Sequence, residues 1–130
     1  MSILPYDYIA GGVLAMLTQH YRQINGYSNQ YWAWGGEDDD MGYRILANNL
    51  TLARPDPLQG RYTMLKHQKR TRVAPKIIRE LLNTAKERWP SDGLSSHPWT
   101  ILKILRKPLF YHMYVDVGEP PSEWLTSSKP

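Results

Sequence analysis

Residues 24–40 of the 130-residue chain read INGYSNQYWAWGGEDDD, and this stretch decides how the middle of the chain folds. Four consecutive acids, Glu37 to Asp40, follow a Gly-Gly pair. Acidic side chains are favoured in the first turn of a helix because they complement the positive end of its macrodipole. Apolar residues follow at helical spacing, namely Met41, Ile45 and Leu46. The stretch therefore predicts a helix that begins at Glu37 and ends near residues 48–49.

The same acids also suit a catalytic cleft. A carboxylate held at a helix N-terminus can take a proton from a sugar hydroxyl while its neighbour binds the other hydroxyls. Trp34 precedes the two glycines, and a tryptophan beside glycines is a recurring lid over a ligand. A calcium loop is disfavoured because the alternating oxygen ligands of such loops are absent. The residues alone leave a simple helix start and a carbohydrate site both open.

Composition narrows the class of protein. The chain has 9 Tyr, 5 Trp, no Cys and a formal charge of +4, and its length suits one domain with a modest core. Tyr and Trp suit both core packing and sugar stacking. The basic run from Lys66 to Arg72 contains no aromatic residue, so it fits a nucleotide diphosphate or a solvated face at least as well as a nucleic acid. Neither a signal peptide nor an apolar run of bilayer-spanning length is predicted.

Hydrophobic spacing and turn residues predict a mixture of helices and short strands. We expect strands at residues 8–16, 51–54 and 61–65, and two more within residues 101–117 on either side of Pro108. We expect helices at residues 19–25 and 76–88, the first with Thr18 as N-cap and Gly26 just past its end. The Pro- and Ser-rich residues 119–130 are expected to form a flexible tail. This mixture indicates an α/β or α+β domain.

Several motifs together resemble one enzyme family. Residues 24–40 closely resemble the signature of β-1,4-galactosyltransferases (glycosyltransferase family 7), and the WGGEDDD string is too long and unusual for chance. Shorter matches follow in family order: Gly11-Gly12-Val13, Arg54-Pro55, Met64-Leu65-Lys66-His67, Ser91-Asp92-Gly93-Leu94 and Val115-Asp116-Val117-Gly118. The resemblance implies the carboxy-terminal part of a GT-A-type α/β catalytic domain at residues 1–118. Its mixed sheet would be flanked by helices, and the amino-terminal nucleotide-binding half would be missing.

The resemblance also implies an activity and an acceptor site. The activity is transfer of Gal or GalNAc from a UDP donor, in β-1,4 linkage, to a GlcNAc-terminated glycan by a metal-dependent inverting displacement. Asp38 matches the base for the acceptor hydroxyl, and Glu37 is the next candidate. Trp34 matches a tryptophan on a mobile loop that closes over the donor, and Ala33 stands where the family has glycine. The implied acceptor-binding residues are Gly36, Glu37, Asp38, Asp39 and Arg79.

The implied metal and donor contacts lie elsewhere in the chain. The family's Met-x-x-His pair supplies Mn²⁺ ligands, and Met64 and His67 match it, although a thioether is an unusual ligand for a hard ion. Lys69 and Arg70 stand where a donor-contacting loop begins, so they and His67 are expected near the diphosphate; a solvated face is equally open. Ile9 stands where vertebrate members carry a tyrosine beside the donor's 2-position. An aliphatic residue there resembles the invertebrate β-1,4-N-acetylgalactosaminyltransferase branch.

Parts of the family pattern are missing. No Asp-x-Asp motif, the source of the third metal ligand, precedes Gly11. We therefore expect a fragment that is inactive alone, from a family anchored in the Golgi membrane with its catalytic part on the lumenal side. The alternative is a catalytically inactive carbohydrate-binding or interaction module derived from the same family. A nucleic-acid partner is not expected.

Overall fold

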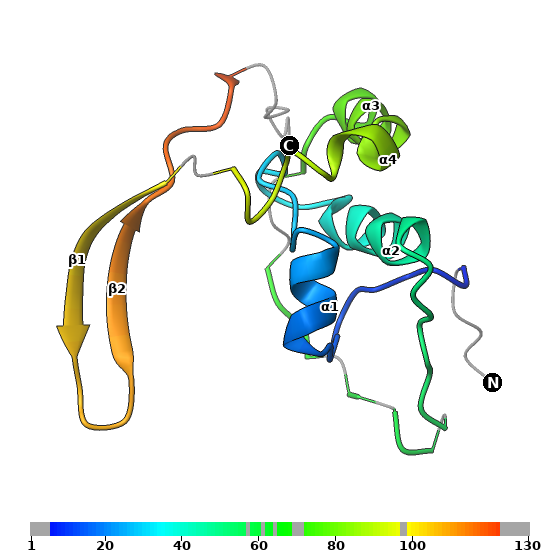
Figure 1. The fold of residues 1–130 in the computed structure, drawn as a ribbon, viewed down its shortest axis with the longest axis horizontal. Helices are drawn as coiled ribbons and strands as arrows, with labels where there is room; N and C mark the ends of the chain where they lie inside the picture. The colour runs from blue at the N-terminus through cyan, green and yellow to red at the C-terminus, as the bar shows by residue number, and fades with distance from the viewer. Residues whose placement is uncertain are drawn as a thin grey trace.

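The computed structural model describes residues 6–56, 58–60, 62–63, 65–68, 72–96 and 99–122. Within these ranges lie the helices α1 (Thr18–Gln23), α2 (Glu37–Ala47), α3 (Pro75–Asn83) and α4 (Ala85–Arg88). The strands β1 (Thr100–Arg106) and β2 (Tyr111–Asp116) form a two-stranded sheet. Figure 1 shows the helices gathered at one side of the molecule and the hairpin extending away from them. None of the described helices is long and apolar enough to cross a membrane.

Helix α2, which the sequence predicts, lies at the centre of the helical part. It begins directly after Gly36, whose φ of 91° favours glycine. All four acids lie in its first turn and Arg44 lies in its last, so the charges complement the dipole at both ends. The small core that it helps to form consists of the buried residues Ala10, Ile24, Met41 and Ile45.

Helix α1 ends at a left-handed residue. Asn25 has a φ of 60°, its N–H donates to the carbonyl of Arg22 at 3.1 Å, and the N–H of Gly26 donates to Tyr21 at 2.9 Å. This pair of hydrogen bonds closes the C-terminus of the helix. The predicted helix is confirmed, but its caps differ, because Thr18 is the first helical residue and Asn25 takes the left-handed position before Gly26.

The segment after α1 is fixed to a loop that lies far away in the sequence. The side chain of Asn25 donates to the carbonyl of Trp89 at 3.0 Å and accepts from the N–H of Ser95 at 2.8 Å. The backbone carbonyl of Asn25 accepts from Leu94 at 2.8 Å. Gly93 has a φ of 147°, and a Cβ there would overlap this carbonyl, so only glycine fits. Two of the motifs quoted from the sequence therefore meet in space.

The hairpin confirms the two strands predicted around Pro108. Ile101 pairs with Val115 and Ile104 pairs with Met113, with a register shift between the two pairs. These four apolar side chains are 40–56% exposed. No residue of either strand is buried, so the hairpin adds nothing to the core of the described part of the chain.

The prediction of a strand over residues 8–16 is wrong. Among the described residues, this segment pairs with no strand, and it packs against α2 instead. Carbonyls of Asp7 and Ile9, which a neighbouring strand would use, accept hydrogen bonds from the side chain of Arg54. Residues 51–54 form no strand either. In the expected strand 61–65, Arg61 and Met64 lie outside the described residues, and the other three are not in a strand.

The helix predicted over residues 76–88 is divided in two. Thr84 follows α3, and its hydroxyl donates back to the carbonyl of Glu80 at 3.0 Å. A threonine that bonds to the preceding turn competes with the backbone and bends the helix, so α4 starts anew at Ala85.

The expected fold class is found in part. The described residues contain helices and one small antiparallel sheet, rather than a mixed sheet flanked by helices. Residues 123–130 of the expected tail lie outside the described residues.

Candidate functional site

Residues 6–11 lie along one side of α2 and contact the acid cluster, which we define as residues 37–40. The hydroxyl of Tyr6 donates to Asp39, and the ring of Tyr8 stacks on Tyr43 with 5.0 Å between centroids. A Cβ at Gly42 would overlap the carbonyl of Tyr8, so the two backbones are in close contact. Residues 39 and 43 are one turn apart, so a single face of α2 carries these contacts.

Asp38 lies over the backbone of Gly11. A Cβ at position 11 would overlap Oδ2 of Asp38, so glycine permits this close approach. The residue is half-buried, and its Oδ1 accepts a hydrogen bond from the N–H of Asp39 at 3.1 Å. Its Oδ2 accepts no hydrogen bond from the described residues. One carboxylate oxygen of Asp38 is therefore not used in a hydrogen bond by the described residues.

The acids on either side of Asp38 are engaged. Glu37 is exposed, and its Oε2 accepts from the N–H of Gly35 at 3.2 Å. Asp39 accepts from the hydroxyl of Tyr6, and this hydrogen bond, together with burial, raises the pKa of Tyr6 well above its usual value. Tyr6 therefore keeps its proton, and its hydrogen bond to Asp39, to a higher pH than an ordinary tyrosine would.

Asp40 has a different environment, because its side chain is completely buried. Its Oδ1 accepts from Nε of Arg44 at 2.5 Å, and its Oδ2 accepts from Nη2 of Arg88 at 2.8 Å and from the hydroxyl of Tyr31 at 3.1 Å. Both arginines also pair with Asp92. Two carboxylates and two guanidiniums thus balance in charge, as buried ions require. We call Asp40, Arg44, Arg88 and Asp92 the buried ion network.

The network ties three segments of the chain together. Arg44 donates from α2 to the carbonyls of Gly26 at 3.1 Å and Asp92 at 2.6 Å, and Ser28 donates to the carboxylate of Asp92 at 2.5 Å. Burial opposes the charge of Arg88, but attraction to the two carboxylates outweighs it and raises the pKa of Arg88. These roles were not among those predicted from the sequence. The signal was present in the i,i+4 spacing of opposite charges at 40/44 and at 88/92.

The loop before α2 packs closely against α3. A Cβ at Gly36 would come within 2.9 Å of the side chain of Ile78. Trp34 is 49% exposed, and the guanidinium of Arg72 lies 4.6 Å from the centre of its ring, which is a cation–π contact. The N–H of Val73 donates to the carbonyl of Trp34 at 3.3 Å. The tryptophan expected to act as a lid is thus attached to residues 72–73.

The structure brings some of the expected site residues together and not others. Residues 36–39 lie together at the start of α2, and the half-buried Ile9 is two residues from the contact between Gly11 and Asp38. Arg79 is exposed on α3, next to Ile78. The expected residues Met64, Lys69 and Arg70 lie outside the described residues.

Comparisons with known proteins decide the family. A family model described as the N-terminal domain of galactosyltransferase matches residues 2–68, just over half of the chain. Mouse β-1,4-galactosyltransferase 2 is 40% identical over 126 residues. The chain belongs to the β-1,4-galactosyltransferase family. The resemblance carried by residues 24–40 is therefore confirmed.

The match to other β-1,4-galactosyltransferases covers most of this chain but only part of theirs. The mouse alignment covers 95% of this chain and 33% of the relative. Human β-1,4-galactosyltransferase 1 is 38% identical over 118 residues, which are 90% of this chain and 30% of the relative. The chain therefore spans about a third of the length of these relatives.

A solved structure from the family shares the fold. It is the catalytic domain of Drosophila β1,4-galactosyltransferase 7 in complex with xylobiose. The TM-score is 0.62 at 26% identity, and the match covers 85% of this chain and 50% of that one. The described architecture is thus similar to about half of a galactosyltransferase catalytic domain.

Of the two manganese ligands expected from the resemblance, only His67 lies among the described residues. They contain no group of three or more His, Cys, Asp or Glu side chains that could hold a metal ion. His67 is exposed, and its Nδ1 lies 3.2 Å from the carbonyl of Leu65, which leaves Nε2 as one candidate ligand. The described part of this galactosyltransferase-family chain does not complete a manganese site by itself.

Proposed function

We propose that this chain supplies the acceptor side of an inverting β-1,4-glycosyltransferase site, in which Asp38 removes the proton from the acceptor hydroxyl. The proposal rests on one observation: the four neighbouring acids differ in their hydrogen-bond and ion-pair partners. Asp40 is buried between two arginines and Asp39 accepts from Tyr6, whereas Oδ2 of Asp38 has no hydrogen-bond partner among the described residues. A general base needs such an available oxygen within reach of the substrate.

The chemistry at this carboxylate is a single displacement. The acceptor hydroxyl oxygen forms a bond to the anomeric carbon of the UDP-sugar as the bond from that carbon to the UDP oxygen breaks. The hydroxyl proton passes to Asp38, and UDP leaves with the bonding electron pair. Attack from the face opposite UDP inverts the anomeric configuration and yields a β-1,4 linkage.

The neighbouring residues would position the acceptor. Glu37 is exposed one residue before Asp38, so its carboxylate can bind the other hydroxyls of the sugar. Gly36 and Asp39 complete the same end of α2, and Arg79 is the more distant candidate. Trp34, half-exposed beside these residues, offers an aromatic face on which a sugar ring can stack.

The donor is proposed to be UDP-GalNAc in preference to UDP-Gal. Ile9 lies two residues from the glycine that Asp38 contacts, which supports a place for it beside the reacting sugar. An isoleucine offers an apolar wall and more room than a tyrosine for an N-acetyl group. Discrimination against the smaller galactose would be weak, about 1–3 kcal/mol per group.

The remaining parts of the site are proposals from family membership. Mn²⁺ would be held in part by Met64 and His67, with Lys69 and Arg70 near the diphosphate, and the ion would neutralise charge on the departing UDP. The nucleotide-binding half would come from polypeptide outside the matched third of the relatives. A location on the lumenal side of the Golgi membrane follows from the same membership.

The base is tested in a chimaera in which residues 6–122 replace the matching segment of mouse β-1,4-galactosyltransferase 2. Asp38→Asn is expected to lower the rate of transfer by about 10²–10⁴-fold, because the amide cannot accept the proton. Asp7→Asn makes the same charge change at an exposed residue and is expected to leave the rate unchanged. Equal rates for Asp38→Asn and the parent chimaera would overturn the proposal and make Glu37 the next residue to test.

The donor is tested by competition between UDP-GalNAc and UDP-Gal in the same chimaera, with a GlcNAc-terminated acceptor. The parent is expected to transfer GalNAc well, and Ile9→Tyr is expected to shift transfer toward galactose, because the larger side chain fills the space of the acetamide. Ile9→Leu is the control of similar volume. Transfer of galactose alone by the parent would refute the assignment of Ile9.

A further inference from the structure

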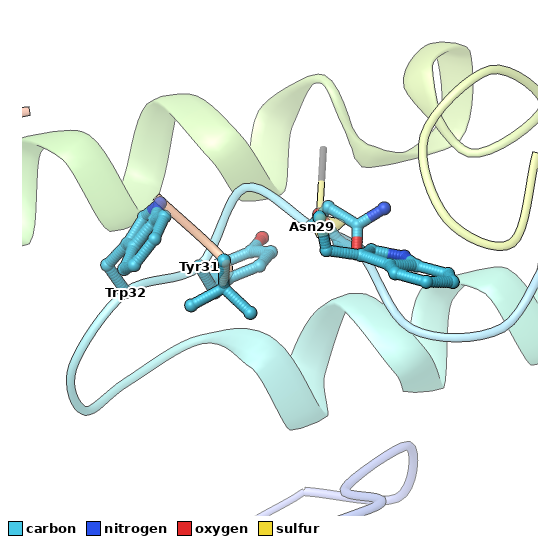
Figure 2. Close-up of a pocket in the computed structure, with 6 residues that line it drawn as sticks. Asn29, Tyr31 and Trp32 are labelled. Atoms are coloured by element: carbon cyan, nitrogen blue, oxygen red, sulfur yellow. The ribbon is translucent and has the colours of Figure 1, made fainter. Parts of the chain in front are cut away.

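A concave site lies away from the acid cluster. It is a pocket of about 300 Å³ between the loop after α1 and the base of the hairpin, where Trp99 precedes β1 and Val117 follows β2. Figure 2 shows Asn29, Tyr31 and Trp32 at its wall. No acid-cluster residue lines this pocket, and neither does Trp34. Residues 28–32 of the family signature therefore border a site that the proposed transfer chemistry does not use.

The wall on the signature side is fixed before any ligand binds. The N–H of Asn29 donates to the carboxylate of Asp92 at 2.9 Å, and the side-chain amide of Asn29 donates to the carbonyl of Gly93 at 2.9 Å. The hydroxyl of Tyr31 donates to the buried Asp40 at 3.1 Å. Because the buried ion network holds this loop, a ligand would bind a largely pre-organised surface, which lowers the entropic cost of binding.

The chemistry of the lining suits a neutral sugar. Trp32, Trp99 and Tyr31 line the pocket with aromatic rings, and none of the described lining residues is charged. The NH₂ group of Asn29 is used within the protein, whereas its Oδ1 accepts no hydrogen bond from the described residues. The indole N–H of Trp32 likewise donates to none of them. One acceptor and one donor thus remain for hydroxyl groups beside the aromatic surface.

The size of the pocket favours a small ligand. A volume of about 300 Å³ is at the lower end of the range for ligand sites in proteins. An adjoining pocket of about 430 Å³ shares Trp99 and Val117, but its other lining residues, Ile101, Met113 and Val115, are apolar. Among the described residues, the lining of that second pocket offers no side-chain polar group to sugar hydroxyls beyond the residues it shares.

We propose that the pocket between residues 28–32 and the base of the hairpin binds one neutral pyranose ring. It is a carbohydrate site in addition to the acceptor site at Asp38, and its existence does not depend on transfer activity. In a glycan-modifying enzyme it would hold a sugar residue of the acceptor or of a neighbouring chain at a distance from the reacting hydroxyl.

The test uses the 130-residue chain and three probes: the methyl β-glycosides of glucose, galactose and N-acetylglucosamine. Indole N–H signals in two-dimensional NMR spectra report binding. At least one glycoside is expected to give saturable shifts with a Kd of about 1 mM or weaker, as for a single small ligand. Val117→Trp, which fills the pocket from an exposed position, is expected to raise that Kd at least about tenfold.

Two further variants separate this site from the rest of the molecule. Ile104→Trp makes a comparable change at an exposed position of the same hairpin that lines neither pocket, and Asp38→Asn alters the proposed acceptor site. Both are expected to bind the glycoside as the parent chain does. Absence of saturable shifts for all three glycosides, or equal loss in both tryptophan variants, would overturn the proposal. Binding that survives Val117→Trp and is lost in Asp38→Asn would overturn it while supporting the acceptor site at Asp38.

Discussion

The helical part of the molecule and the hairpin differ in what holds them in place. Around α2, a buried core, the buried ion network and the hydrogen bonds of Asn25 join residues that lie up to 70 positions apart in the sequence. In the hairpin, β1 and β2 pair with each other, and every residue of both strands is at least partly exposed. The contacts specific to the family signature are therefore concentrated in the helical part. The hairpin carries an exposed apolar surface. Its fold depends on the pairing between its own two strands.

The largest effect on stability is expected from breaking the buried ion network. Arg44→Ala would leave Asp40 and Asp92 buried with one guanidinium fewer, and removal of one partner from a buried pair typically costs about 3–5 kcal/mol. The free energy of unfolding, measured in urea by tryptophan fluorescence, checks this. Lys76→Ala, which removes an exposed cation of α3, is the control and is expected to cost less than about 0.5 kcal/mol. A similar loss in both variants would mean that the buried ion network contributes no more to the free energy of unfolding than an exposed cation does.

The same substitution in the two regions compares them directly. Met41→Ala removes a fully buried side chain and is expected to cost about 2–5 kcal/mol. Met113→Ala removes a side chain that is 56% exposed on the hairpin and is expected to cost less than about 0.5 kcal/mol. Urea unfolding of both variants measures the difference. Comparable losses would show that the hairpin face is covered in solution.

A small gain in stability is expected in the loop before α2. Ala33 has a φ of 61°, a left-handed conformation that costs a residue with a Cβ about 1–2 kcal/mol. Ala33→Gly removes this strain but adds backbone freedom to the unfolded chain, so the net gain is expected to be at most about 1 kcal/mol. Ala47→Gly, in the last turn of α2, is expected to be destabilising by a similar amount. A loss of stability in Ala33→Gly would contradict the strain at this position.

The sequence predicted the elements whose signals are local. The acids and the apolar spacing of residues 37–47 specified α2, and Pro108 separated the two strands of the hairpin. The strand predicted over residues 8–16 was wrong because an apolar run is equally compatible with packing against a helix, which is what Tyr8 and Ala10 do. The predicted long helix is interrupted at Thr84, whose hydroxyl donates to the carbonyls of Glu80 and Leu81, and a helical pattern does not report such hydrogen bonds.

The different environments of the four acids in the acid cluster could be assigned only from the three-dimensional structure. Glu37, Asp38, Asp39 and Asp40 are adjacent and chemically similar, so the sequence alone could not assign their environments without the family resemblance. Asp40 differs because Arg88, 48 residues later, approaches its carboxylate, and Asp39 differs because Tyr6 lies beside it. Contacts at such separations are set by how segments pack, which local patterns do not report.

The most direct test of this assignment is a paired measurement on Asp38→Asn and Asp40→Asn in the chimaera with mouse β-1,4-galactosyltransferase 2. Both the rate of transfer and the free energy of unfolding are measured for each variant. Asp38→Asn is expected to lose about 10²–10⁴-fold in rate while its unfolding free energy stays within about 0.5 kcal/mol of the parent. Asp40→Asn is expected to lose several kcal/mol of stability, because the buried Arg44 and the partly buried Arg88 lose a charged partner. A stable, fully active Asp38→Asn enzyme, or an Asp40→Asn enzyme as stable as the parent, would contradict the assignment.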